Sequence, residues 1–133
     1  MNIEKTDALL INFEKIKKIA SQGLAVVPVV VQDIKTKEVL VLAYTNEIAF
    51  KKTQETKLVH FWSTSKNKLW LKGEESQNYL ELVEMRINCE QNALLYLVNL
   101  QGAGACHVTN KDNKPFFSCF YRKVNLNSQK LTF

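Results

Sequence analysis

Short runs in which apolar and polar residues alternate follow one another along most of this chain, a pattern typical of strands. The exception lies near the start, where four apolar residues recur at helical spacing: Leu9, Phe13, Ile16 and Ala20. Thr6 or Asp7 can cap the beginning of such a helix, and Gly23 can end it. The pattern therefore predicts an amphipathic helix over residues 7–20.

Seven later segments have the composition of strands: 25–32, 38–44, 58–63, 68–72, 79–89, 93–100 and 116–124. The polar turn 33–37 indicates that the first two form a hairpin, and Pro28 favours an edge strand or a bulge for the first. The polar turn 64–67 joins the third and fourth strands. Asn46 can cap a short helix that runs to about residue 53.

The clearest alternation lies in residues 79–89, where Val83, Met85, Ile87 and Cys89 fall on one face of the predicted strand. Residues 101–105 form a glycine-rich loop ahead of the last strand. No long helices separate the strands, so we predict a mostly β or α+β fold with antiparallel-rich sheets and an N-terminal helix. A length of 133 residues suits one domain over 1–133.

Composition narrows the classes of partner and compartment. Hydrophobic residues make up 46% of the chain and charged residues 23%, as in soluble globular proteins, and no apolar run is long enough to span a membrane. The net charge of +5 is spread over dispersed lysines, so we expect a solvated basic surface and neither nucleic acid nor a membrane as partner. Residues 1–6 do not resemble a signal peptide, and three cysteines are an odd number, so we expect a reducing, cytoplasmic location.

The three cysteines, Cys89, Cys106 and Cys119, are candidates for a metal site. Three thiolates leave one position of a tetrahedral zinc ion for water, the arrangement found in catalytic zinc sites. The alternative is that each cysteine is a small buried hydrophobic residue, because the chain has no closely spaced cysteine pair. His107 follows Cys106 directly and is the candidate general base, the alternative being a hydrogen-bonded loop histidine.

A series of short motifs extends from about residue 23 to residue 123: VPVVVQD at 27–33, EVLVLAY at 38–44, NE at 46–47, FWS at 61–63, KLW at 68–70, KGE at 72–74, ACH at 105–107 and SCFYR at 118–122. Together and in this order they resemble the phosphoribosyl-AMP cyclohydrolase family of histidine biosynthesis. The resemblance implies a zinc-dependent hydrolase that opens the N1–C6 bond of a purine substituted on N1. It also implies an intertwined homodimer in which zinc ligands are shared between chains.

Carried over residue by residue, the resemblance places the zinc ligands on Cys89, Cys106 and Cys119 and the catalytic base on His107. It also supplies candidate contacts to the phosphorylated purine nucleotide: Ser63, Ser65, Lys72, Glu74 and Ser76.

The chain departs from the family pattern in two places. The aspartates that the family places around its first cysteine as a magnesium site are replaced by Asn88, Glu90 and Asn92. Because magnesium favours carboxylate oxygens, these residues predict a degenerate site that binds the ion weakly or not at all. Thr64 replaces an arginine of the phosphate region, and Gln77 replaces a glycine.

These departures keep three functions open. The first is an active phosphoribosyl-AMP cyclohydrolase. The second is a divergent paralogue that hydrolyses a related N-heterocyclic nucleotide. The third is a zinc-stabilised dimer that binds a nucleotide without turnover. The retained cysteines and His107 favour the first, whereas the lost aspartates and arginine favour the other two.

Overall fold

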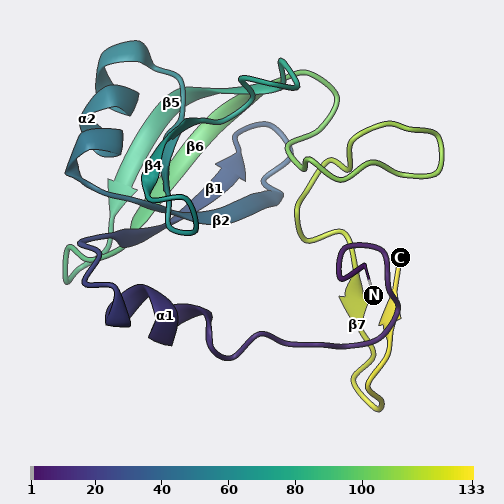
Figure 1. Cartoon of the computed structure of the whole chain (residues 1–133). Helices are drawn as coiled ribbons and strands as arrows, with labels where there is room; N and C mark the ends of the chain where they lie inside the picture. The colour runs from purple at the N-terminus through teal and green to yellow at the C-terminus, as the bar shows by residue number, and fades with distance from the viewer. Residues whose placement is uncertain (1) are drawn as a thin grey trace.

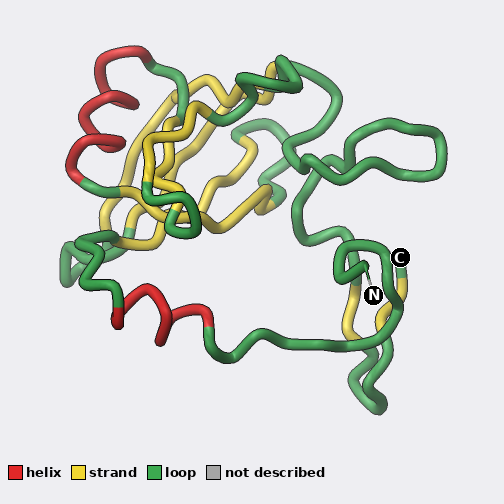
Figure 2. The backbone as a smooth tube through the Cα atoms, in the orientation of Figure 1, coloured by secondary structure: helices red, strands yellow, loops and turns green. Residues whose placement is uncertain are grey.

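A computed structural model describes residues 2–133 and shows the predicted α+β architecture (Figures 1 and 2). In chain order the elements are α1 (Lys15–Ser21), β1 (Val27–Asp33), β2 (Val39–Thr45), α2 (Glu47–Thr56), β3 (His60–Ser63), β4 (Lys68–Leu71), β5 (Tyr79–Ile87), β6 (Leu94–Gln101), β7 (Lys123–Val124) and β8 (Leu131–Thr132). The main sheet has the order β2-β1-β6-β5, and only the β1–β6 pair is parallel. The prediction of antiparallel-rich sheets is therefore confirmed.

The predicted hairpin of β1 and β2 forms, but β1 is an inner strand, so the edge position expected from Pro28 is wrong. Pro28 lies opposite Tyr44 of β2, and pairing with β6 begins one residue later, at Val29. A proline is tolerated near the start of an inner strand because the ladder on one side has not begun there. The irregularity in the β1–β2 register falls between Val31 and Gln32, three residues beyond the proline.

Strand β5 contains a bulge that changes the predicted alternation. Its register against β6 shifts between Leu82 and Glu84, so Val83 is the extra residue and is exposed. Leu80 and Leu82 pack on the core before the bulge, and Met85 packs on it afterwards. A strict period of two fails across a bulge because the inserted residue reverses which positions face inward. The strand also ends at Ile87, so Cys89 lies in the following turn and not in the strand.

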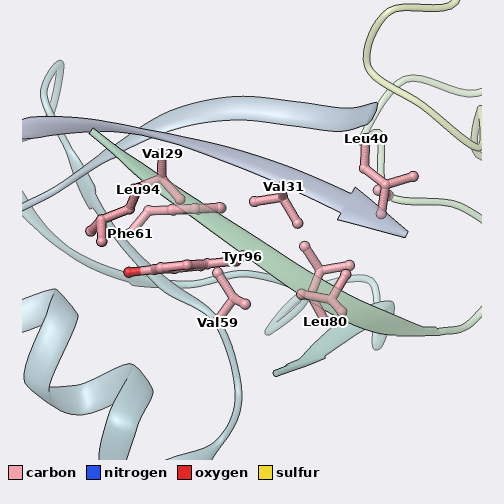
Figure 3. Packing of buried hydrophobic residues seen from close by; sticks show 10 residues of the cluster. Val29, Val31, Leu40, Val59, Phe61, Leu80, Leu94 and Tyr96 are labelled. Atoms are coloured by element: carbon pink, nitrogen blue, oxygen red, sulfur yellow. The ribbon is translucent and has the colours of Figure 1, made fainter. Parts of the chain in front are cut away.

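The hydrophobic core lies between the main sheet and the layer formed by α2 and the β3–β4 hairpin (Figure 3). Its largest fully buried side chains include Tyr96, Phe61, Leu40 and Leu80. Helix α2 begins as predicted at Asn46, whose side chain accepts a hydrogen bond from the Ala49 amide at 2.9 Å. The sheet, α2 and the hairpin thus form the scaffold on which the loops of the candidate site are placed.

The N-terminal helix is shorter than predicted, because α1 spans only Lys15–Ser21. The residues before it pair with the C-terminus instead: the Asp7 carbonyl accepts from the Leu131 amide, and the Leu9 amide donates to Gln129. These bonds occupy backbone groups that a helix would need, so neither Thr6 nor Asp7 acts as the cap. Gly23 ends the helix as predicted, with a φ of 67°.

The strand predicted over residues 116–124 is wrong. The Phe116 amide donates to Val108 and the Cys119 amide donates to Leu40, and regular pairing begins only at β7. Because the segment changes partner every few residues, no continuous ladder can form. The two ends of the chain lie side by side next to β7 and β8 (Figure 1).

Within residues 2–133, none of the helices has the length and apolar character that crossing a bilayer would require.

Candidate functional site

Two of the three cysteines meet next to β2. The Cys119 amide donates to the Leu40 carbonyl at 2.7 Å, and the Cys106 amide donates to the Phe116 carbonyl at 3.2 Å. Burial raises the pKa of the Cys119 thiol, and the neighbouring Cys106 thiol, which is within hydrogen-bonding reach, raises it further. Cys106 is buried, whereas Cys119 is exposed at the surface. The structure therefore brings together two thiols with one side open.

Lys72 lies beside these thiols and is only 6% exposed. Burial lowers the pKa of its ammonium group, and the Cys106 and Cys119 thiols act in the opposite direction. The ammonium nitrogen also lies 5.5 Å from the centre of the Trp70 ring. None of the ion pairs formed by residues 2–133 involves Lys72. The Cys106 and Cys119 thiols are the acidic groups that influence the pKa of Lys72. Lys72 is thus buried in this structure, and its predicted contact with the substrate stays a prediction.

Cys89 lies elsewhere, in the turn between β5 and β6. Cys106 follows the opposite end of β6, and a strand of eight residues separates its ends by roughly 25 Å. Accordingly, no group of three histidine, cysteine, aspartate or glutamate side chains gathers at one point in the described chain, residues 2–133. One chain alone thus assembles two of the three predicted zinc ligands.

Asn88, Glu90 and Asn92, the predicted degenerate magnesium site, bind one another across the Cys89 turn. The Asn88 side-chain oxygen accepts from the amides of Asn92 and Ala93, both at 2.9 Å, and its nitrogen donates to the Asn92 side-chain oxygen at 2.6 Å. The Asn92 side chain in turn donates to Glu90 at 3.2 Å. A cation would have to compete with these bonds, so the three side chains have a structural role in shaping the turn.

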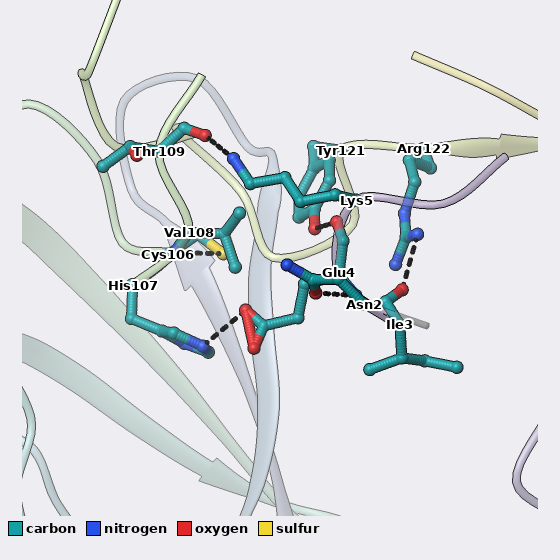
Figure 4. A network of polar contacts seen from close by, with 10 residues as sticks. All are labelled: Asn2, Ile3, Glu4, Lys5, Cys106, His107, Val108, Thr109, Tyr121 and Arg122. Atoms are coloured by element: carbon teal, nitrogen blue, oxygen red, sulfur yellow. Dashed lines mark hydrogen bonds and ion pairs between the residues drawn. The ribbon is translucent and has the colours of Figure 1, made fainter. Parts of the chain in front are cut away.

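His107 is exposed and its Nε2 lies 3.0 Å from a carboxylate oxygen of Glu4 (Figure 4). Glu4 belongs to the N-terminal segment and is 103 positions away along the chain. His60, the other histidine, is buried, and its Nδ1 lies 2.9 Å from the Leu58 carbonyl, as befits a structural residue. Of the two histidines, only His107 has a ring that can meet a ligand.

The predicted substrate contacts fall in two turns. Glu74 and Ser76 lie in the exposed turn that follows Lys72, and Asn78 joins this turn to the loop before Cys106 by accepting from the Ala103 amide at 3.3 Å. At the other end of β4, Ser63 ends β3 and Ser65 lies in the β3–β4 turn, with their hydroxyls 3.4 Å apart. The structure therefore places the Glu74 turn near the cysteine pair and the serine turn at a distance of roughly one four-residue strand, about 13 Å, from Lys72.

Sequence reasoning missed two features of this region. Gly102 has a φ of 129°, and a Cβ there would lie 1.9 Å from the Asn78 side-chain oxygen. The sequence around Glu4 did not indicate a functional contact, because a single carboxylate in a polar segment belongs to no periodic pattern or motif. Gln77, which stands where the family pattern has a glycine, has a φ of 65°, in the left-handed region that favours glycine.

A sequence profile described as phosphoribosyl-AMP cyclohydrolase matches residues 41–121. The chain belongs to this family. It is 52% identical to the phosphoribosyl-AMP cyclohydrolase of Archaeoglobus fulgidus over 98 residues, which cover 74% of this chain and 84% of that protein. It is 42% identical to the one of Clostridium botulinum over 124 residues, which cover 93% of this chain and all of that protein.

A second kind of relative is larger. The histidine biosynthesis bifunctional protein HisIE of Lactococcus lactis is 48% identical over 98 residues, which cover 74% of this chain but 43% of that protein. This member of the cyclohydrolase family therefore corresponds to one part of the bifunctional protein. The family makes the chain a hydrolase acting on a cyclic amidine C–N bond. The matched range contains all three cysteines and His107 but not Glu4.

Proposed function

We propose that this chain is a zinc-dependent phosphoribosyl-AMP cyclohydrolase, which opens the purine ring at the N1–C6 bond by hydrolysis in histidine biosynthesis. The observation that carries the proposal is the pairing of the Cys106 and Cys119 thiols, with the buried Lys72 ammonium near enough to influence the pKa of Cys119. Thiols that serve only as core residues need no such cation. Relatives that carry this name and are about 40–50% identical support the substrate.

The donor set fits zinc. Cysteine thiolates are soft ligands that suit this ion, and an open side on the pair leaves room for a third ligand and for water. We infer that Cys89 of a second copy supplies the third thiolate, since the turn that carries it and the loop that leads to Cys106 lie at opposite ends of β6, a strand roughly 25 Å long. When bound, zinc supplies a Lewis acid and activates water near neutral pH.

The surface beside the Cys89 turn supports a second copy. A hollow of about 380 Å³ there is lined mainly by apolar residues: Val30, Arg86, Ile87, Asn88, Ala93, Leu94 and Leu95. Ile87 is 54% exposed, and Leu42 on the same sheet is 46% exposed. Covering large apolar side chains of this kind stabilises an interface by about 25 cal/mol per Å² of apolar surface removed from water. A homodimer would bury this patch and carry Cys89 to the partner.

The residues around the zinc site then have distinct roles in the proposed reaction. Lys72 holds positive charge against the two thiolates, and His107 accepts or returns the proton that moves during hydrolysis. Glu74 and Ser76 lie on an exposed turn from which they can contact the ribose and phosphate, and Ser63 and Ser65 offer hydroxyls further along the hairpin. The hydrogen-bonded amides around Cys89 support a reaction that does not require magnesium.

The decisive experiment is complementation between two inactive variants, Cys89→Ser and Cys106→Ser. Each homodimer lacks a ligand in both of its sites and is expected to lose zinc and turnover of phosphoribosyl-AMP. When the two chains are refolded together, a mixed dimer contains one complete site, built from the Cys89 of one chain and the Cys106 of the other. Zinc content and activity should therefore return in part. A mixture as inactive as its components would refute the shared site.

A second test concerns the base. His107→Ala is expected to keep zinc and fold but to lower kcat by roughly 100-fold, the scale of a general-base contribution. His60→Gln serves as the contrasting variant, because it alters a buried structural histidine and should act on stability. An unchanged kcat in the His107 variant would leave that residue with a surface role only.

A further inference from the structure

Hydrogen bonds to its backbone hold the N-terminal segment beside His107 (Figure 4). The Tyr121 hydroxyl donates to the Glu4 carbonyl at 2.6 Å. The Arg122 guanidinium donates to the carbonyls of Ile3 and Thr6 at 2.9 and 3.0 Å. These bonds fix the main chain on both sides of Glu4. The backbone that carries Glu4 is therefore held beside His107 by contacts other than the ion pair.

That carboxylate is directed at one atom. Glu4 Oε2 lies 3.0 Å from His107 Nε2, and a carboxylate can only accept, so Nε2 carries the hydrogen. Among the residues that the structure describes, Nδ1 of His107 has no hydrogen-bond partner. A hydrogen bond at one ring nitrogen fixes the tautomer and the ring plane and leaves the other nitrogen as the basic atom.

We propose that Glu4 is a positioning residue: its hydrogen bond to Nε2 orients the His107 ring and leaves Nδ1 as the free ring nitrogen. The inference rests on the proposed function in one respect, the role of His107 as base. Stability does not account for the contact, since an ion pair this exposed contributes little to folding. Glu4 also lies outside the range that the family profile matches, so this device belongs to this chain's N-terminal segment.

The contact itself can be tested without any substrate. The chain has two histidines, and the structure predicts opposite tautomers for them: hydrogen on Nε2 in His107 and on Nδ1 in His60, which faces the Leu58 carbonyl. Long-range nitrogen–proton correlation spectra at pH 8 should show both. Proton–proton contacts between the His107 ring and the Glu4 side chain should also appear and should vanish in Glu4→Ala while His60 is unchanged. Their absence in the native protein would overturn the inference.

The catalytic consequence is tested by a cycle of variants with phosphoribosyl-AMP as substrate. Glu4→Ala should lower kcat by roughly 10-fold, the scale of removing a partner that orients a functional histidine, with KM and zinc content unchanged. Glu4→Gln should recover part of the loss, because its amide oxygen still accepts. Glu14→Ala is the matched control, an exposed carboxylate that pairs with Lys17 instead.

The double variant separates the two proposals. In a His107→Ala background, Glu4→Ala should have no further effect on kcat. A native kcat in Glu4→Ala, or an equal loss in both backgrounds, would overturn the positioning role. If His107→Ala alone retained full activity, the proposed base would be refuted, whereas the spectroscopic contact would still show whether Glu4 fixes the ring.

Discussion

Gly102 gives the sharpest test of how the loops around the cysteine pair are held together. It follows β6 and has a φ of 129°, a conformation that side-chain-bearing residues rarely adopt. An added Cβ would lie 1.9 Å from Oδ1 and 2.8 Å from Cγ of Asn78. Asn78 uses this oxygen to accept from the Ala103 amide and so ties the Glu74 turn to the loop before Cys106. Gly102→Ala therefore alters both a backbone conformation and this junction.

The expected cost has two parts. Forcing a residue with a side chain into a sparsely populated region costs about 1–3 kcal/mol. Displacing the Asn78 side chain breaks its hydrogen bond to Ala103, which contributes about 1 kcal/mol. The free energy of unfolding should thus fall by about 2–4 kcal/mol, a large share of the 5–15 kcal/mol typical of a domain.

The assay is urea unfolding of the native and variant proteins under identical metal conditions. Gly23→Ala is the matched control, because Gly23 also has a positive φ, 67°, but nothing lies within 4 Å of the added Cβ. This control should lose only about 1 kcal/mol. In an Asn78→Ala background the obstructing oxygen is gone, so Gly102→Ala should cost at least about 1 kcal/mol less than in the native chain.

Two results would refute this reasoning. A loss for Gly102→Ala no larger than that for Gly23→Ala would show that the contact with Asn78 is not made. An equal loss with and without the Asn78 side chain would place the whole effect in the backbone conformation. Either result would remove the physical link between the Glu74 turn and the cysteine loop.

Three further predictions concern other parts of the chain. Burial raises the pKa of Tyr96 to about 12, so the folded protein keeps a proton that the unfolded chain loses near pH 10. The free energy of unfolding should therefore fall by about 1 kcal/mol between pH 9 and pH 11, as measured by urea unfolding. The Tyr96→Phe variant should lack this decline. Gln77→Val should lower stability by about 1–2 kcal/mol, whereas Gln77→Gly should not, because the position has a positive φ. Replacing Asn88, Glu90 and Asn92 together by aspartate should create magnesium binding in calorimetry and a magnesium-dependent rate, neither of which the native protein should show.

Local patterns predicted the elements that depend on local physics. Asn46 begins α2, Gly23 ends α1, and the β1–β2 and β3–β4 hairpins form where polar turns separate apolar runs. The bulge at Val83 could not be predicted, because one inserted residue leaves both halves of β5 alternating normally. The predicted length of α1 was wrong for a different reason: helical spacing over residues 7–20 was overridden by pairing with β8 and its neighbours, 120 or more residues away.

In the candidate site, too, features set by neighbouring residues could be predicted, whereas contacts between distant segments could not. The motif pointed to Cys106 and His107 as candidates, but it did not reveal that Lys72 is buried near the thiols or that Glu4 reaches the imidazole. Both contacts join segments that approach only in the folded chain. Family resemblance could not supply the second of them, since Glu4 precedes the matched range.

Within one chain, Cys89 lies apart from the other two cysteines, in the turn between β5 and β6. A single chain offers zinc two thiols, and two thiolates bind the ion far less tightly than three. If the third comes from a second copy, zinc affinity and dimer formation are coupled, because a ligand that binds only the assembled state stabilises that state. Dilution should then release zinc, and chelation should favour the monomer. The hydrogen-bonded amides of Asn88 and Asn92 fit this arrangement, since they shape the Cys89 turn before any partner arrives and thereby reduce the entropy lost when the thiolate is delivered.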